Sequence, residues 1–417
     1  MSASFEPGAP STEDFIPLCV PEIRGNEWKY IKECLDTNWV SSVGAYVNRF
    51  EQMVANYVGT DHAVATVNGT SALHTALLVA GVEPDDEVLV STLTFIAPAN
   101  AIRYANAWPV FVDAEPEYWQ MSPQNVVDFL EQECYFQYGE VRNKRTGRRV
   151  KAIMPVHILG HPVDMDPILE VARKYNLLVI EDATESLGAK YKGRMVGHLG
   201  DIACFSFNGN KILTTGGGGM IVTDNEAWAR KAKYLTTQAK DNPVEYIHHE
   251  IGYNYRLTNM QAAMGCAQME NLDEYIAAKR RIATTYSEAF ANVAGLTPMR
   301  EATWASSIFW MYTLLVDESQ YGQDSRQLLR RLQEAKIQTR PLWEPLHRSI
   351  AHKQSQPSAP LPALVPRLVL TKEGTEGSGG GAVADKLNQQ ALSLPCSVGL
   401  TLADQQRVIE LILKEKR

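Results

Sequence analysis

The chain has 417 residues, 45% of them hydrophobic and 21% charged, which is an ordinary composition for a soluble globular protein. This length exceeds the usual size of one hydrophobic core, so two domains are expected. The formal net charge of −8 argues against a nucleic-acid partner, and no run approaches the roughly 20 apolar residues that span a membrane. The six cysteines are scattered and the N-terminal run MSASFEPGAPSTEDF lacks signal-peptide character, so we expect reduced thiols in a cytoplasmic protein.

From Ile23 to about Val316, short apolar runs of strand type alternate with segments of helical period. This alternation predicts an α/β fold, a mostly parallel sheet with helices on both faces. The expected strands are His62–Val67, Glu87–Val90, Pro109–Val112, Lys151–Pro155, Leu177–Glu181, Ile202–Phe207 and Gly219–Thr223. The expected helices are Gly25–Asp36, Ser71–Ala80, Ala97–Asn106, Pro167–Tyr175 and Glu226–Leu235, with a long one from Asn259 past Arg281.

The pattern changes after about Leu296, where a smaller α/β unit is expected. Its elements are a strand at Phe309–Val316, a helix at Ser325–Ala335, a strand at Ile337–Arg340 and a closing helix at Leu402–Lys414. We therefore predict a large domain over residues 1–295 and a small C-terminal domain over residues 296–417. The stretch 354–381 is rich in Pro, Ser and Gly, which predicts a flexible loop or an active-site lid.

Two further segments resemble binding sites, but we predict no catalytic or ligand-binding role for them. Tyr138–Val150 holds five basic residues, but charge runs usually lie at the surface, so we expect a solvated hairpin. His157 and His161 have i, i+4 spacing, yet they follow a strand and lack the glutamate of an H-E-x-x-H motif. We interpret them as pocket-lining or structural residues and predict no metal site.

Three motifs, in chain order, point to one cofactor. In the first, VNGTSAL, a strand ends in a small-residue turn that opens a helix; this can bind a phosphate, although an ordinary capped turn has the same pattern. In the second, VIEDATES, Asp182 ends an apolar strand, where a carboxylate can keep a heteroaromatic nitrogen protonated or can simply cap a helix.

The third motif is ACFSFNGNK followed by TTGGGGM. Its Lys211 is flanked by hydroxyls and small residues that let backbone approach a ligand closely. A lysine held beside a cationic ring has a lowered pKa, which suits an imine-forming amine. The order of phosphate cradle, carboxylate and lysine suits a single cofactor.

Over almost its whole length the chain resembles the pyridoxal-5′-phosphate (PLP) dependent sugar aminotransferases of the DegT/DnrJ/StrS family, which share the aspartate aminotransferase fold (fold type I). The matching stretches are NGTSALHTAL, STLTFIAPANAI, PVFVDAEPE, VIEDATESLGAKYKGRMVGHLGDIACFSFNGNKILTTGGGGMIVTD, GYNYRLTNMQAAMG and LSLPCSVGLT. Several long motifs in the same order make this resemblance specific.

The resemblance implies roles for individual residues. Lys211 falls where the family's Schiff-base lysine sits, and Asp182 where a carboxylate pairs with the pyridine nitrogen. Glu185 stands near the cofactor's 3′-oxygen, where many members carry Gln or His, so its protonation state is open. The other implied cofactor contacts are Gly69, Thr70 and Ser206 to the phosphate with help from Ser71, Phe95 stacked on the ring, and Asn254 reaching the phosphate of the neighbouring subunit in a homodimer with shared active sites.

The stretches GNEWKYIKECLDTNWVSSVGAYVNRFE and YLTTQAKDNPVEYIHHEIGYNYRLTN resemble one branch of the family more closely. That branch aminates C4 of a nucleotide-linked 4-keto-6-deoxy-N-acetylhexosamine on the way to legionaminic acid and similar surface sugars. The resemblance places five residues near the substrate, although structural packing explains each of them equally well. They are Trp39, Ser41 and Ser42 in an active-site loop, and Arg340 and His347 in TRPLWEPLH.

The reaction implied is a two-stage transamination from L-glutamate, through the pyridoxamine form (PMP), to a keto sugar, with UDP as the expected carrier. A GDP- or dTDP-linked, perosamine-like substrate is an alternative. A same-fold dehydratase carries histidine in place of the lysine, so Lys211 argues against it. A PLP-binding regulator without turnover remains open.

Overall fold

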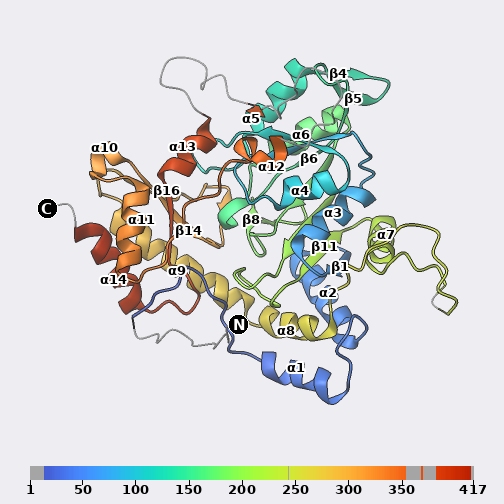
Figure 1. The fold of residues 1–417 in the computed structure, drawn as a ribbon, viewed down its shortest axis with the longest axis horizontal. Helices are drawn as coiled ribbons and strands as arrows, with labels where there is room; N and C mark the ends of the chain where they lie inside the picture. The colour runs from blue at the N-terminus through green and yellow to red at the C-terminus, as the bar shows by residue number, and fades with distance from the viewer. Residues whose placement is uncertain (1–13, 243, 354–367, 370–381, 415–417) are drawn as a thin grey trace, which may run out of the picture.

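The structure is a computed structural model that describes residues 14–242, 244–353, 368–369 and 382–414. Within these residues, a ten-stranded sheet forms the centre of the molecule (Figure 1). Its main path runs in the order β1 (His62–Thr66), β11 (Gly219–Thr223), β10 (Ile202–Ser206), β7 (Leu178–Asp182), β6 (Arg149–Met154), β2 (Glu87–Ser91), β3 (Trp108–Val112) and β15 (Leu368–Val369). The pairs from β10 to β15 are parallel, whereas β11 runs antiparallel to β1 and β10. The predicted α/β fold with a mostly parallel sheet is confirmed.

Helices cover the sheet, which explains why its central strands are largely buried and rich in apolar residues. All five residues of β2 are buried, as expected for a parallel strand with both faces covered. Helix α3 packs on β10 and β11 and against α4 and α7, while α6 packs on β6 and β7 beside α5. These helices are α3 (Gly69–Val79), α4 (Ala97–Tyr104), α5 (Pro123–Asp128), α6 (Met165–Tyr175) and α7 (Glu226–Thr236).

The predicted long helix after Asn259 is wrong in one respect, because it is two helices. They are α8 (Asn259–Met269) and α9 (Leu272–Phe290), separated at Glu270 and Asn271. Helix α8 begins at a capping box made by Thr258 and Gln261, and it packs against α1 (Glu27–Asp36) and α2 (Ala45–Val58). Helix α9 instead runs toward the C-terminal elements (Figure 1). The apolar spacing continues across the break, so periodicity alone did not reveal that α8 and α9 pack against different elements.

A second, three-stranded sheet lies among the C-terminal elements, drawn orange to red in Figure 1. It is antiparallel and consists of β12 (Leu296–Pro298), β14 (Tyr312–Val316) and β16 (Ala391–Leu394). Its helices are α10 (Glu318–Tyr321), α11 (Ser325–Glu334), α13 (Val383–Gln390) and α14 (Leu402–Leu413). Helix α12 (Ile350–Lys353) instead lies against β3, where the His352 ring contacts Phe111. The predicted strand Ile337–Arg340 is wrong: the segment makes only isolated bridges, from Ile337 to Ile16 and from Arg340 to Ser393.

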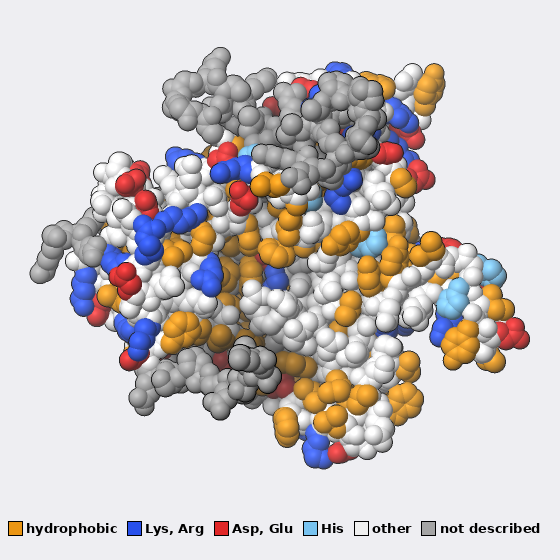
Figure 2. Space-filling view, viewed as in Figure 1, with side chains coloured by type: hydrophobic (Ala, Val, Ile, Leu, Met, Phe, Trp, Pro, Cys, Tyr) orange, Lys and Arg blue, Asp and Glu red, His pale blue; other side chains and the backbone are white. Residues whose placement is uncertain are grey.

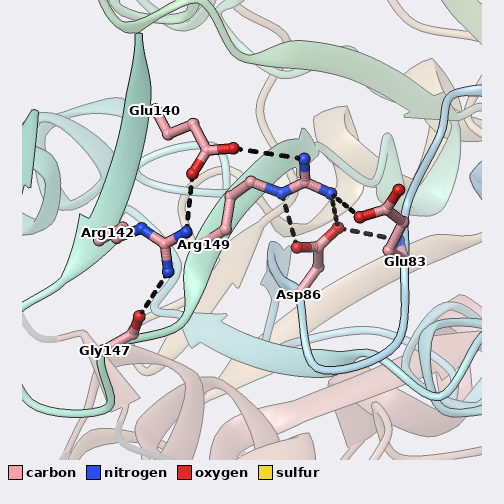
Figure 3. Close-up of polar contacts among 6 residues, drawn as sticks. All are labelled: Glu83, Asp86, Glu140, Arg142, Gly147 and Arg149. Carbon is pink, nitrogen blue, oxygen red and sulfur yellow. Dashed lines mark hydrogen bonds and ion pairs between the residues drawn. The ribbon is translucent and has the colours of Figure 1, made fainter. Parts of the chain in front are cut away.

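The basic segment Tyr138–Val150 is a hairpin, as predicted, but its arginines are paired rather than simply solvated. Strand β4 (Cys134–Gln137) pairs with β5 (Glu140–Asn143), which continues onto β6. Arg149 donates from Nε and Nη2 to the carboxylate of Asp86 at 2.7 Å, and Arg142 donates to Glu140 at 2.8 Å (Figure 3). These acids compensate the positive charge of Arg142 and Arg149.

The remaining short elements are β8 (Lys190–Tyr191), β9 (Arg194–Met195) and β13 (Ala305–Ser306), which form a small sheet, and the single-turn helices Phe129–Glu133, Ile158–Gly160 and Leu346–Arg348. The loop predicted at 354–381 lies outside the described residues apart from β15. The domain boundary at 295/296 stays a prediction. No helix in the described ranges combines the length and apolar character needed to cross a membrane.

Candidate active site

A cavity of about 420 Å³ opens at the carboxyl ends of β7 and β10. Asp182 is the last residue of β7 and Ser206 the last of β10; because these neighbouring strands are parallel, their ends meet at the same edge of the sheet. Seven of the residues predicted to bind cofactor line this one cavity: Gly69, Thr70, Phe95, Asp182, Glu185, Ser206 and Lys211.

The start of α3 forms one wall of the cavity. Asn68 caps the helix, its side-chain oxygen accepting a hydrogen bond from the Ser71 backbone N–H at 2.8 Å. A Cβ added at Gly69 would lie 2.8 Å from Ser206 Cβ and 3.2 Å from Thr184 Cγ2, so only glycine allows the helix start to lie this close to β10. The first N–H groups of a helix have no partner within it, and they carry its positive dipole end. The wall therefore suits a phosphate.

Asp182 lies at the floor of the cavity with only 2% of its surface exposed. Its Oδ1 accepts a hydrogen bond from the Thr184 N–H at 3.1 Å. Burial raises the pKa of this carboxyl, and hydrogen bonds from Thr184 and the charge of Lys211 only partly oppose the effect. A cationic N–H placed in the cavity would stabilise the carboxylate, as a protonated pyridine nitrogen does.

Lys211 projects into the cavity from the turn after β10. Its Nζ lies 3.5 Å from Glu185 Oε1 and 4.2 Å from the centre of the Trp310 ring. Glu185 is 4% exposed and its Oε2 accepts a hydrogen bond from the Leu159 N–H at 2.9 Å. Burial raises the pKa of Glu185, while the charge of Lys211 lowers it. The lysine is thus placed between an aromatic face and a carboxyl that holds protons more readily than usual.

Comparison with known proteins identifies the class to which this site belongs. Residues 21–413 match the DegT/DnrJ/EryC1/StrS aminotransferase family. The chain belongs to this family. It is 40% identical over 395 residues to a GDP-perosamine synthase of Caulobacter vibrioides, covering 94% of this chain and 96% of that protein.

Two further relatives of this aminotransferase support the assignment. It is 39% identical to the putative pyridoxal phosphate-dependent aminotransferase EpsN of Bacillus subtilis, over 95% of each chain. The crystal structure of a family aminotransferase from Brucella abortus superposes with a TM-score of 0.79 at 26% identity, covering 93% of this chain and 94% of that one. The predicted fold type I is confirmed, and so is PLP as the cofactor of this family.

The structure also places in the cavity residues of this aminotransferase that the motifs did not single out. Trp310 comes from the end of the segment before β14, and its Nε1 donates to the Asn210 carbonyl at 2.7 Å. Trp343 comes from the segment TRPLWEPLH. Neither residue lies near the three motifs in sequence, and only the fold brings them back to Lys211. The remaining polar lining residues are Asn68, Thr94, Thr184, Asn208 and Asn210.

Four predicted residues from the N-terminal part of the chain lie outside the cavity lining. Ser71 is buried, and its N–H is occupied by the Asn68 cap. Trp39 is 56% exposed and borders a separate hollow beside α2. The backbone oxygens of Trp39 and Ser41 accept hydrogen bonds from Asn259 at 2.7 and 2.6 Å. Ser42 follows this contact and is partly buried. Packing accounts for these contacts within one chain.

The two C-terminal predictions also lie away from the cavity lining. Arg340 is exposed, and its Nη1 donates to the Thr339 carbonyl at 3.0 Å. His347 Nδ1 lies 2.9 Å from Thr92 Oγ1 and its Nε2 lies 3.4 Å from Asp385. Burial lowers the pKa of His347. This histidine links the end of β2 to α13. Asn254 is exposed beside the bridge to Thr237, and its predicted contact with a neighbouring subunit stays a prediction.

The histidines set aside as pocket-lining or structural are structural. His157 Nε2 lies 3.1 Å from Glu181, and its Nδ1 accepts from the Val163 N–H at 3.0 Å. His161 Nδ1 lies 2.7 Å from the Pro162 carbonyl, and its Nε2 accepts from the Ala302 N–H at 3.1 Å. Both rings have each nitrogen engaged by protein groups.

Proposed function

We propose that the chain transfers the amino group of L-glutamate to C4 of a nucleotide-linked 4-keto-6-deoxy sugar, using PLP. One observation carries the proposal: Lys211, Asp182 and the amino end of α3 open onto the same cavity. A lysine, a buried carboxyl and a phosphate-binding helix end are the three contacts that PLP requires of an aminotransferase. Family membership supports aminotransfer, and the site chemistry supports this cofactor.

Bound PLP supplies an aldehyde that exchanges between amines and a ring that accepts electrons. Gly69, Thr70 and Ser206 hold its phosphate against the positive end of α3. Asp182 keeps the pyridine nitrogen protonated, because its buried carboxylate is stabilised by a cation. Phe95, which lines the cavity, would lie against the ring. Lys211 Nζ would anchor the cofactor and, as a free amine, would accept the proton of the glutamate α-carbon.

The nucleotide carrier is the least determined part of the proposal. The GDP-perosamine synthase of Caulobacter vibrioides matches nearly the whole chain, and its name states a GDP-linked amino-sugar product. This similarity favours the GDP-linked alternative over the UDP-linked N-acetyl sugar of the legionaminic branch. Both substrates share the 4-keto group on which the transfer acts, so the chemistry of Lys211 is the same for either.

A homodimer with shared active sites is part of the proposal. Large apolar side chains of α1 and of the segment leading to α2 are exposed, namely Trp28, Leu35, Trp39, Val40 and Val43. Figure 2 shows hydrophobic side chains gathered over this end of the molecule. A contiguous apolar patch on a globular protein is typical of an interaction surface. Burial of this surface by a second copy would bring Trp39, Ser41 and Ser42 into a shared interface.

The test separates the two half-reactions. The purified holoprotein is mixed with L-glutamate alone, and the cofactor's absorption is followed; conversion to the amine form supports aminotransfer, and no change indicates a regulator without turnover. The amine form is then mixed with GDP-, UDP- and dTDP-linked 4-keto-6-deoxy sugars, and products are analysed by mass spectrometry. Amination of none of them, despite normal turnover of glutamate, would overturn the sugar substrate while leaving aminotransfer intact.

A further inference from the structure

Two cysteines and a buried lysine form a cluster beneath the active site, and the proposed reaction uses none of them. Lys279 of α9 is 2% exposed. Its Nζ lies 3.4 Å from Cys19 Sγ and 3.6 Å from Cys396 Sγ, and it donates to the Trp310 carbonyl at 2.8 Å. Cys19 comes from the N-terminal segment and Cys396 from the turn after β16, so the fold alone assembles the cluster.

The backbone already aligns the two cysteines. The Cys396 N–H donates to the Leu18 carbonyl at 2.8 Å, and the Val20 N–H donates to Ser397 Oγ at 3.0 Å. These bonds flank the cysteines on both segments, and both sulfurs lie within 3.6 Å of the same Lys279 Nζ. A disulfide requires neighbouring Cα atoms whose side chains point toward each other. Because the two segments are hydrogen-bonded beside the cysteines and both sulfurs approach one Lys279 Nζ, we expect local movement to be enough to join them.

The pKa values of the two cysteines are shifted in opposite directions. A hydrogen bond from Cys396, together with the charge of Lys279, lowers the pKa of Cys19 to about 5. The same contact raises the pKa of Cys396 well above its ordinary value. Burial alone would lower the pKa of Lys279, but the two sulfurs raise it, so the lysine stays an ammonium. These opposite shifts favour a thiolate at Cys19 and a thiol at Cys396, which is the arrangement of a nucleophile and its resolving partner.

We propose that Cys19 and Cys396 form an oxidation site that closes to a disulfide with hydrogen peroxide as the oxidant. The Cys19 thiolate attacks one peroxide oxygen, the O–O bond breaks, and with one proton taken up the products are a sulfenic acid and water. The Cys396 sulfur then attacks the Cys19 sulfur, the S–O bond breaks, and a second water leaves. Overall, two thiols and one peroxide give one disulfide and two waters.

The cluster borders the turn that carries Lys211. Cys19 Sγ lies 3.4 Å from the Asn210 carbonyl oxygen, which also accepts the Trp310 indole N–H. The face of Trp310 lies 4.2 Å from Lys211 Nζ. Disulfide formation removes the negative sulfur that balances Lys279, and the buried ammonium is left with the Trp310 carbonyl as its remaining partner among these contacts. We expect Trp310 and Lys211 to shift, and the turnover of the oxidised holoenzyme to fall about tenfold.

The test treats the holoprotein with hydrogen peroxide and measures intact mass, peptide maps without reductant, and turnover. The expected result is loss of the mass of two hydrogens, a cross-linked pair of peptides holding Cys19 and Cys396, and a fall in turnover that dithiothreitol reverses. Gain of oxygen without a cross-link, a bond from sulfur through oxygen to Lys279, or no change in mass would overturn the proposal. So would a complete cross-link that leaves turnover unaltered.

Two variants and one control keep the test decisive. Cys19→Ser and Cys396→Ser should each abolish the cross-link and the fall in turnover; either one suffices if the other fails to fold, as judged by its thermal transition. Cys134→Ser is the matched control, because Cys134 is also buried but lies in β4, far along the sheet. It should cross-link like the parent. A cross-link surviving in the Cys19 or Cys396 variant would contradict the assignment.

Discussion

Strand β7 ends in two adjacent carboxyls that serve opposite purposes. Glu181 and Asp182 are both fully buried, but successive side chains of a strand point to opposite faces. Glu181 accepts hydrogen bonds from three backbone N–H groups, those of Gly197, Leu199 and Gly200, at 2.7 to 2.9 Å, and it contacts His157. Although burial opposes the change, His157 and these N–H groups lower the pKa of Glu181. Its charge is satisfied by the protein.

Asp182 differs in having far fewer donors from the protein. Burial raises the pKa of its carboxyl, and the side chain faces the cavity. The comparison shows that burial by itself does not mark a functional carboxylate. What distinguishes Asp182 is that few protein groups oppose the effect of burial on its carboxyl, which leaves it open to pair with the ring nitrogen of the proposed cofactor.

The largest effect on activity is expected at Lys211, which shares the cavity with Asp182. Lys211→Ala should lower kcat about 10⁴-fold, because the variant loses the amine that anchors the cofactor and moves the proton. Lys211→Arg, which keeps the charge but cannot form the same bond, should be equally inactive. Turnover with glutamate measures both, and Lys192→Ala, an exposed lysine in β9's hairpin, is the control. Parent-like activity in Lys211→Ala would remove the basis of the proposed function.

Replacing the Asp182 carboxyl should lower the catalytic rate without unfolding the protein. Asp182→Asn should lower kcat about 10³-fold, because an amide does not hold a pyridine nitrogen in its protonated form. The holoprotein's circular dichroism spectrum should match that of the parent. A kcat within threefold of the parent would show that Asp182 is not the partner of the ring.

Replacing the Glu181 carboxyl should have the opposite effect, lowering stability while leaving the catalytic rate nearly unchanged. Glu181→Gln should lower the free energy of unfolding by about 3 kcal/mol, because the amide cannot accept every N–H bond and leaves its own buried donors without acceptors. Urea unfolding of the cofactor-free protein measures the loss. The folded fraction should keep a kcat near that of the parent. A stable but inactive variant would erase the distinction between the two residues.

The smallest expected effect is the contribution of Asp182 to the pH dependence of the free energy of unfolding, measured without cofactor. The folded pKa of Asp182 is raised above its unfolded value of about 3.9, so its stabilising contribution is present at low pH and is lost as pH rises through the folded pKa. Asp182→Asn should therefore raise the free energy of unfolding by about 1 kcal/mol at pH 7.5, with the gain shrinking toward pH 4. Urea unfolding across this range checks the slope. Loss of stability at pH 7.5 would mean that the carboxylate is already satisfied.

Local patterns were enough to predict the sheet and the centre of the cavity. Asp182, Lys211 and Gly69 each lie at a strand end or a helix start, and the short segment around each residue carries the signal. Segments joined only by the fold were predicted less well. The break between α8 and α9 follows from a change of packing partner, and Ile337–Arg340 lacks a neighbouring strand to make it more than two bridges.

The sequence by itself determined the α/β class, the family and seven residues that line one cavity, because each depends on order and composition within short stretches. Only the tertiary structure decided that Trp310 and Trp343 line the cavity and that Cys19 meets Cys396 across Lys279. Those contacts join segments far apart in the chain. Alternation of apolar and polar residues specifies which elements form, but the packing of the whole core decides which side chains become neighbours.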